Sequence, residues 1–141
     1  MNPPQPRLGR HPLDPPKLHD GAALLARMVA DGRLPSDDAY DTIRFWVNDN
    51  RTGVDKSGLQ ARLCHTFIDA AADRERMRGR AEAAVIATGR RMIEDGTDPV
   101  RILAAAAKAA ERVGAGLLDE ESVRALLRAE WDRAHTRFRR R

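Results

Sequence analysis

The sequence is poor in cysteine, in aromatic residues and in long apolar runs. Its one cysteine, Cys64, excludes a disulfide within the chain, and residues 1–17 contain no apolar segment of a secretion signal. Both features predict a reducing, cytoplasmic location. The longest apolar run, residues 102–107, is far shorter than the roughly 20 residues that a membrane-spanning helix needs. We therefore expect a soluble protein without a membrane partner.

Aromatic residues make up only 4% of the chain, although hydrophobic residues reach 42%. Much of the apolar content is alanine, which favours closely packed helices but buries little area per residue. The length of 141 residues corresponds to one domain. Because an alanine-rich core of this size is thin, we expect a partner protein or a second copy of the chain to add to its stability.

No set of residues has the spacing of a catalytic or metal site. Cys64 and His65 are adjacent, so on a helix their side chains point about 100° apart and cannot bind one ion together. The segment around Gly114 and Gly116 lacks the lysine and the preceding strand of a phosphate-binding loop. Paired acids follow the predicted helix starts, where capping and the helix dipole account for them. We expect no metal, no cofactor and no enzymatic activity.

Proline is concentrated at the N-terminus. Residues 1–19 contain six of the eight prolines, and each proline fixes its φ angle and lacks an N–H donor. We predict a disordered, proline-rich tail over residues 1–19, a helical domain over residues 20–136 and a basic arm over residues 137–141. The tail is either a simple leader, which we favour, or a docking peptide for a partner.

The rest of the sequence alternates amphipathic helical segments with turn residues. This pattern predicts an all-α fold, an irregular bundle of about five helices with one long central helix. We place the helices at residues 20–31, 36–50, 57–95, 98–113 and from 119 onward. Their starts carry Asp20, Ser36, Asp98 and Asp119, which are residue types that cap helix N-termini.

The predicted helix over residues 57–95 is unusually long. Apolar residues recur at helical spacing over residues 59–92, and a continuous helix would span about 58 Å at 1.5 Å per residue. Arg74 interrupts the apolar stripe, and Gly79 lowers the helix propensity. A break between Ala72 and Gly79 is the alternative to the continuous helix, which we favour.

Two segments of the chain resemble each other. Residues 32–46 and 116–131 each contain a glycine that ends a helix, a leucine, an acidic helix start and an amphipathic helix with a tryptophan. The tryptophans are offset by one residue, and two copies do not make a repeat array. We attribute the similarity to two helix–turn–helix junctions with the same kind of cap.

Arginine is concentrated in two blocks. Residues 74–91 contain six arginines against two glutamates, and residues 133–141 contain five arginines and no acid. At about 100° per residue, most arginines of residues 76–91 lie opposite the apolar stripe and form a ridge about 22 Å long. Arginine forks suit phosphate oxygens, so the two blocks indicate binding to the backbone of a nucleic acid. The candidate residues are Arg76, Arg80, Arg90, Arg91, Arg137, Arg139, Arg140 and Arg141.

Two alternatives to nucleic-acid binding remain open. The arginines are an ordinary solvated surface if they pair with neighbouring acids. The protein is an interaction or structural subunit if its apolar stripes bind a partner helix or a second copy of the chain as a homodimer. The candidate contact residues are Leu63, Phe67, Met77, Trp131 and Phe138.

Residues 99–134 (PVRILAAAAKAAERVGAGLLDEESVRALLRAEWDRA) combine an alanine-rich helix, a glycine turn, a leucine with an acidic cap and a leucine-rich helix. This segment resembles the helical accessory segments that follow the catalytic domain of phage- and plasmid-type primase-polymerases. The resemblance covers about a quarter of the chain and shares no catalytic residue. It implies a replication or mobile-element context in which a helical bundle contacts nucleic acid.

Overall fold

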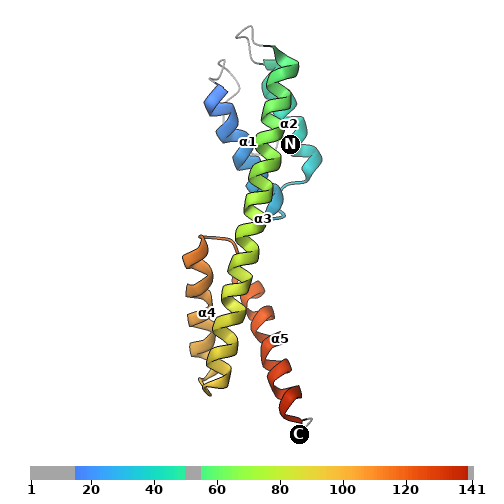
Figure 1. Cartoon of the computed structure of the whole chain (residues 1–141). Coiled ribbons are helices and arrows are strands. Elements are labelled where there is room, and N and C mark those ends of the chain that lie inside the picture. The colour runs from blue at the N-terminus through green and yellow to red at the C-terminus, as the bar shows by residue number, and fades with distance from the viewer. Residues whose placement is uncertain (1–14, 50–54, 140–141) are drawn as a thin grey trace. The chain divides into compact units, whose positions relative to one another are not determined.

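The computed structural model describes residues 15–49 and 55–139. These residues form five α-helices and no strand: α1 (Pro15–Ala30), α2 (Ser36–Asp49), α3 (Lys56–Glu94), α4 (Pro99–Val113) and α5 (Glu120–Arg139) (Figure 1). The predicted all-α fold with one long central helix is confirmed. Helix α3 is continuous over 39 residues, so the alternative of a break near Gly79 is wrong.

The chain divides into two compact units, residues 1–74 and residues 75–141. Unit 1 contains α1, α2 and the first half of α3, and unit 2 contains the second half of α3 with α4 and α5 (Figure 1). Each unit has its own apolar cluster. The length of the sequence predicted one domain; within the described residues, each half of the apolar stripe of α3 is buried by a different helical hairpin.

Helix α1 begins earlier than the proline content indicated. The predicted tail extended to His19, but α1 starts at Pro15, and Leu18 is buried. Proline is tolerated in the first turn of a helix, where its missing N–H would have no intrahelical partner. His19 contacts α3, because its Nδ1 lies 2.6 Å from the hydroxyl of Thr66. The rest of the predicted tail, residues 1–14, lies outside the described residues.

The core of unit 1 is built from large apolar side chains. Ile43 and Trp46 of α2 are buried in one cluster with Leu63 and Phe67 of α3 and with several residues of α1. Large side chains bury more area per residue than alanine does. The thin core that the composition predicted is therefore not a property of this unit.

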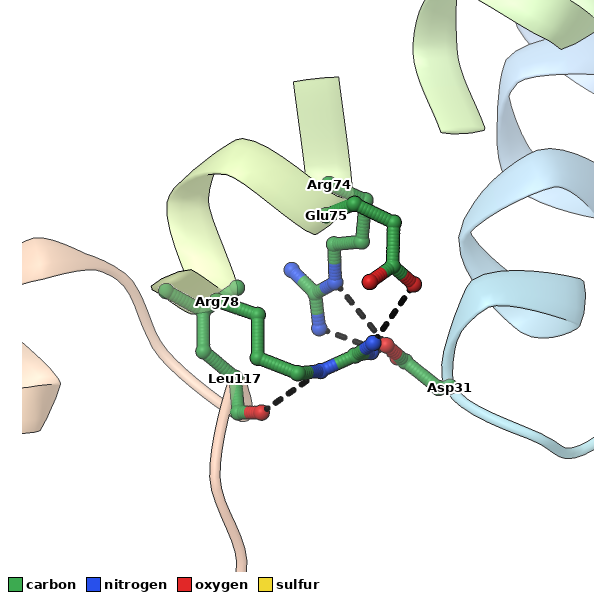
Figure 2. Close-up of polar contacts among 5 residues, drawn as sticks. All are labelled: Asp31, Arg74, Glu75, Arg78 and Leu117. Carbon is green, nitrogen blue, oxygen red and sulfur yellow. Dashed lines mark hydrogen bonds and ion pairs between the residues drawn. The ribbon is translucent and has the colours of Figure 1, made fainter. Parts of the chain in front are cut away.

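Arg74 lies on the apolar stripe of α3, where an unpaired charge would be costly. Its Nε and NH2 donate to the two carboxylate oxygens of Asp31, each at 3.0 Å, and both side chains are largely buried (Figure 2). Asp31 directly follows α1, so this contact also joins the end of α1 to α3. The two-pronged ion pair explains how α3 carries an arginine in its stripe without a break.

Unit 2 packs mainly small side chains. Ala81 and Val85 of α3 belong to one buried cluster with Ala106 and Ala110 of α4. A Cβ atom at Gly89 would lie 2.8 Å from the side chain of Leu127 on α5, so the glycine lets this leucine pack against the backbone of α3. The close packing expected of alanine-rich helices is found in this unit.

The turns of the α1–α2 and α4–α5 hairpins each contain a glycine with a positive φ angle. Gly32 and Gly116 have φ angles of 75° and 72°, in the left-handed region that favours glycine. At an offset of 84 positions, residues 14–47 align with residues 98–131 without a gap, and nine of these 34 residue pairs are identical. The same offset aligns the first residue of α1 with that of α4, and the first residue of α2 with that of α5. The two hairpins are therefore counterparts over most of their length, and shared caps alone do not explain their similarity.

Two of the predicted N-terminal caps are present. Asp98 accepts hydrogen bonds from the backbone N–H groups of Val100 and Arg101, at 3.0 and 3.2 Å. Asp119 accepts a hydrogen bond from the backbone N–H of Ser122 at 2.7 Å. Hydrogen bonds from the side chain and the backbone of Ser122 lower the pKa of Asp119 from its ordinary value of 3.8. The ionised carboxylate is thus the form that caps α5.

The Asp119 cap makes a contribution to stability that depends on pH. Because its pKa is lower in the folded state, the carboxylate stabilises the fold above a pH of 3.8, and this stabilisation is lost as the pH falls through the lower, folded value. Asp119→Asn keeps a capping oxygen but has no titrating group. We expect it to be less stable than wild type near neutral pH, with a difference that shrinks below a pH of 3.8.

Urea unfolding of wild type and Asp119→Asn at several pH values measures this difference. Between about pH 6 and pH 5 the difference should stay constant, because the carboxylate is ionised in both the folded and the unfolded state. A difference that is also constant down to about pH 3 would contradict the lowered pKa of Asp119.

Leu63 is fully buried in unit 1, whereas Ile68 of the same helix is 53% exposed. We expect Leu63→Ala to lower the free energy of unfolding by about 2–5 kcal/mol, since it removes buried methyl groups and leaves a cavity. Ile68→Ala is the matched control and should lower it by at most about 1 kcal/mol. In a Trp131→Phe background Trp46 is the sole tryptophan, so its fluorescence reports the unfolding of unit 1 in urea. Equal effects of the two alanine variants would contradict the placement of Leu63 in the core.

Candidate nucleic-acid interface

The solvent-exposed face of α3 in unit 2 carries three of the predicted nucleic-acid residues. Arg76, Arg80 and Arg91 are exposed. Ala81 and Val85, on the opposite face of the helix, are buried. The helical repeat thus directs the three arginine side chains toward solvent. Among the described residues, no ion pair involves Arg80 or Arg91, so their guanidinium donors remain available for a ligand.

Arg90 differs because it has a structural partner on α5. Its Nε and NH2 donate to the carboxylate of Glu130 at 2.8 and 3.3 Å, and the NH1 of Arg133 lies 3.2 Å from the same carboxylate. The side chain of Glu130 is only 4% exposed, whereas that of Arg90 is 54% exposed. Hydrogen bonding to Glu130 and its negative charge raise the pKa of Arg90 above its ordinary value. Arg90 therefore neutralises a buried acid. The sequence predicted only a phosphate-binding role for this residue and not this structural one.

Arg78 is a second structural arginine of unit 2 and lies off the predicted ridge. Its Nε donates to the carbonyl of Leu117 at 3.5 Å, and its NH1 lies 2.7 Å from the carboxylate of Glu75 (Figure 2). Leu117 belongs to the turn between α4 and α5. This arginine therefore joins α3 to the turn of the hairpin that covers it.

The C-terminal arginines lie at the end of α5 and beyond it. The helix extends to Arg139, so the predicted arm over residues 137–141 begins as helix. The last two residues lie outside the described part of the chain, as do the side chains of residues 137–139. The nucleic-acid role of Arg137, Arg139, Arg140 and Arg141 and the partner role of Phe138 stay predictions.

The other predicted partner-binding residues are of two kinds. Leu63 and Phe67 are buried in unit 1, where they hold α3 against the α1–α2 hairpin and cannot also form an exposed contact surface. Met77 is partly buried at the edge of the unit 2 cluster. Trp131 of α5 is 37% exposed and stacks on His135, with ring centroids 4.5 Å apart. Helical periodicity alone does not distinguish stripe residues that the chain covers from those that it leaves open.

Two further features that would bear on function, a membrane-spanning helix and a metal-binding cluster, are not found in the described part of the chain. Within residues 15–49 and 55–139, no helix is long and apolar enough to cross a membrane. The same ranges contain no group of three or more His, Cys, Asp or Glu side chains that could hold a metal ion. Cys64 is partly buried and packs against the apolar cluster of unit 1.

The buried position of Glu130 was not predicted from the sequence. A glutamate on an amphipathic helix is expected to face solvent, because charged side chains are seldom buried unless they are paired. The alignment of the two hairpins contains the signal that would have identified it, since Glu130 corresponds to Trp46, which is buried in unit 1. Arg90 supplies the charge that a carboxylate needs at such a position.

Arg90 and its neighbour Arg91 offer a matched pair of variants. Arg90→Met leaves Glu130 buried with less compensation, whereas Arg91→Met leaves no buried charge. We expect Arg90→Met to lower the melting temperature clearly more than Arg91→Met does. The double variant Arg90→Met/Glu130→Met should recover most of the loss, because two apolar side chains then replace the ion pair. Thermal unfolding followed by circular dichroism measures these shifts, and equal shifts for the two single variants would show that Glu130 does not depend on Arg90.

The chain has no match among protein-family models, curated protein sequences or solved structures. Its function is therefore inferred from its own side chains.

Proposed function

We propose that the protein is a non-catalytic module that binds the phosphate backbone of a nucleic acid through the exposed face of α3 in unit 2. The observation that carries this proposal is that Arg80 and Arg91 are exposed, share one helix face with Arg76, and have no ion pair in the described part of the chain. Guanidinium groups remain charged at physiological pH and donate to phosphate oxygens in a fork. Several of them on one face of a rigid helix form a phosphate-binding surface.

The spacing of these arginines suits an extended polyanion better than a single small anion. Arg76 and Arg80 lie about one helical turn apart, and Arg91 lies about 16 Å further along the axis. The face spans about 22 Å, which corresponds to about six base pairs of a duplex at 3.4 Å per step. Ala83 and Ala87 lie between the arginines and are exposed, so a nucleic-acid backbone can approach α3 closely there.

The remaining parts of the proposal concern the C-terminus and the biological setting. In this proposal Arg137 and residues 139–141 also contact phosphate, because their guanidinium groups carry the same charge and donors. Cations at a helix C-terminus interact favourably with the helix dipole as well. A replication or mobile-element setting rests on the resemblance of residues 99–134 alone. Contacts to phosphate carry little sequence information, so we expect weak base preference.

Fluorescence polarisation with labelled duplex DNA, single-stranded DNA and RNA over a series of salt concentrations tests the proposal. We expect the logarithm of the affinity to fall linearly with the logarithm of the salt concentration, with a slope of about 0.9 for each duplex phosphate contacted. Arg76→Glu/Arg80→Glu/Arg91→Glu should weaken binding at low salt by at least about tenfold and lower the slope by about 2–3.

The matched control is Arg27→Glu/Arg33→Glu/Arg62→Glu in unit 1, which changes the net charge equally at three exposed arginines. It should retain the wild-type slope, and circular dichroism of both variants checks that the helices remain folded. Equal losses of affinity in the two variants would show that binding depends on the net charge of the protein and not on the position of the arginines. Absence of binding to all three probes at low salt would overturn the proposal.

A further inference from the structure

The spacing of the arginines on the exposed face of α3 in unit 2 is uneven. Arg76 and Arg80 lie about one helical turn apart, whereas Arg80 and Arg91 are separated by about 16 Å along the helix axis. At about 100° per residue, all three point into an arc of about 60°. The face therefore has a basic group at each end, Arg76 with Arg80 at the first end and Arg91 at the second, and a long gap between the two groups.

The gap contains no side chain that binds phosphate. Of residues 81–89, only Ala83 and Ala87 are exposed, and both lie on the face that carries the arginines. A single strand that followed the helix axis would place phosphates over these alanines, because the charges of one strand lie about 3.4 Å apart along a duplex. Alanine methyl groups offer no donor to those phosphates. The pattern therefore favours a nucleic acid that has no backbone over the gap.

Exposed acids lie directly beyond both basic groups. Asp73 precedes Arg76 by three residues and is exposed. Glu94 follows Arg91 by three residues and is exposed as well. The helical repeat places both acids on the face of the arginines, so a duplex lying lengthwise on α3 would bring its phosphates beside two carboxylates that repel them. A duplex that crosses α3 avoids both acids.

The opposite face of α3 is the one that the hairpin of unit 2 covers. Ala81 and Val85 are buried in one cluster with residues of α4 and α5, and Gly89 packs against Leu127. Within unit 2, the two basic groups and the gap between them are therefore open to a ligand along their whole length.

We propose that the nucleic acid is double-stranded DNA and that α3 lies across its major groove. Arg76 and Arg80 then bind one of the phosphate backbones that border the groove, and Arg91 binds the other. The major groove of B-form DNA is about 12 Å wide and the minor groove about 6 Å. The gap of about 16 Å spans the major groove together with its bordering phosphates, and it is too wide for the minor groove. This inference rests on the proposed function.

The alanines of the gap lie over the edges of the base pairs in this arrangement. Base sequence is read mainly by hydrogen bonds to those edges, and the side chains of Ala83 and Ala87 form none. The bridge across the groove therefore retains the weak base preference of the proposed function.

A relocation of one arginine at constant charge tests the bridge by fluorescence polarisation. Arg91→Ala/Ala87→Arg, the relocated variant, keeps three arginines on the face but shortens the gap to about 10 Å. We expect its affinity for a short labelled DNA duplex to fall at least about fivefold, and its salt slope to fall by about 1, because the second backbone is no longer reached.

Probes without this groove should not respond to the relocation. The affinity for single-stranded DNA should change by less than about twofold, since a flexible strand follows the arginines in either position. Double-stranded RNA has a deep, narrow major groove, so its binding should be equally insensitive. Ala87→Arg alone is the matched control. It keeps Arg91 and should bind the DNA duplex at least as tightly as wild type, and circular dichroism checks that both variants remain folded.

The outcomes separate this inference from the proposed function. Equal affinity of wild type and the relocated variant for the DNA duplex would overturn the bridge, while the binding itself would leave the proposed function standing. Equal losses for duplex and single strand would also overturn it, because binding would then depend on Arg91 itself and not on the width of the gap. Absence of binding to every probe would remove both the proposed function and the bridge.

Discussion

The apolar stripe of α3 is the constraint on which both units depend, because neither hairpin has a core without it. In unit 1 the stripe contributes large side chains such as Leu63 and Phe67, and in unit 2 it contributes small ones such as Ala81. The helix must stay intact through Arg74, where the stripe meets a positive charge. The two-pronged pair with Asp31 offsets the cost of that charge, so one helix can serve two cores.

The arginines of α3 differ in whether their guanidinium donors bind other groups of the protein. Arg74 and Arg90 each place two donors on one carboxylate, and Arg78 reaches a backbone carbonyl of the α4–α5 turn. These residues hold helices together, and each has at least two of its five guanidinium donors engaged within the protein. Arg80 and Arg91 lie on the same helix but point to solvent. A count of arginines along the sequence therefore overstates the number of arginines without a structural role.

The sequence predicted the features of this fold that depend on neighbouring residues. The helices, the Asp98 and Asp119 caps and the continuity of α3 follow from spacing and residue type over a few turns. The burial of Glu130 could not be predicted in this way, because it depends on Arg90, which is distant in the sequence. The early start of α1 was missed because proline density was given more weight than the tolerance for proline in a first helical turn. The exposure of Trp131 also depends on which helices cover which faces, and periodicity does not contain that information.

When the two hairpins are aligned, the tryptophan of unit 2 lies one position later than that of unit 1, so Glu130 takes the place of Trp46. This difference connects several features that distinguish unit 2 from unit 1. Trp46 is buried in unit 1, whereas Trp131, one position further along the aligned helix, is 37% exposed. The core position then belongs to Glu130, and a buried carboxylate requires a cation. Arg90 supplies that cation and is thereby drawn away from the exposed ridge. The buried acid, the structural arginine and the exposed tryptophan of unit 2 are thus connected through the one-position difference in where the two hairpins carry their tryptophan.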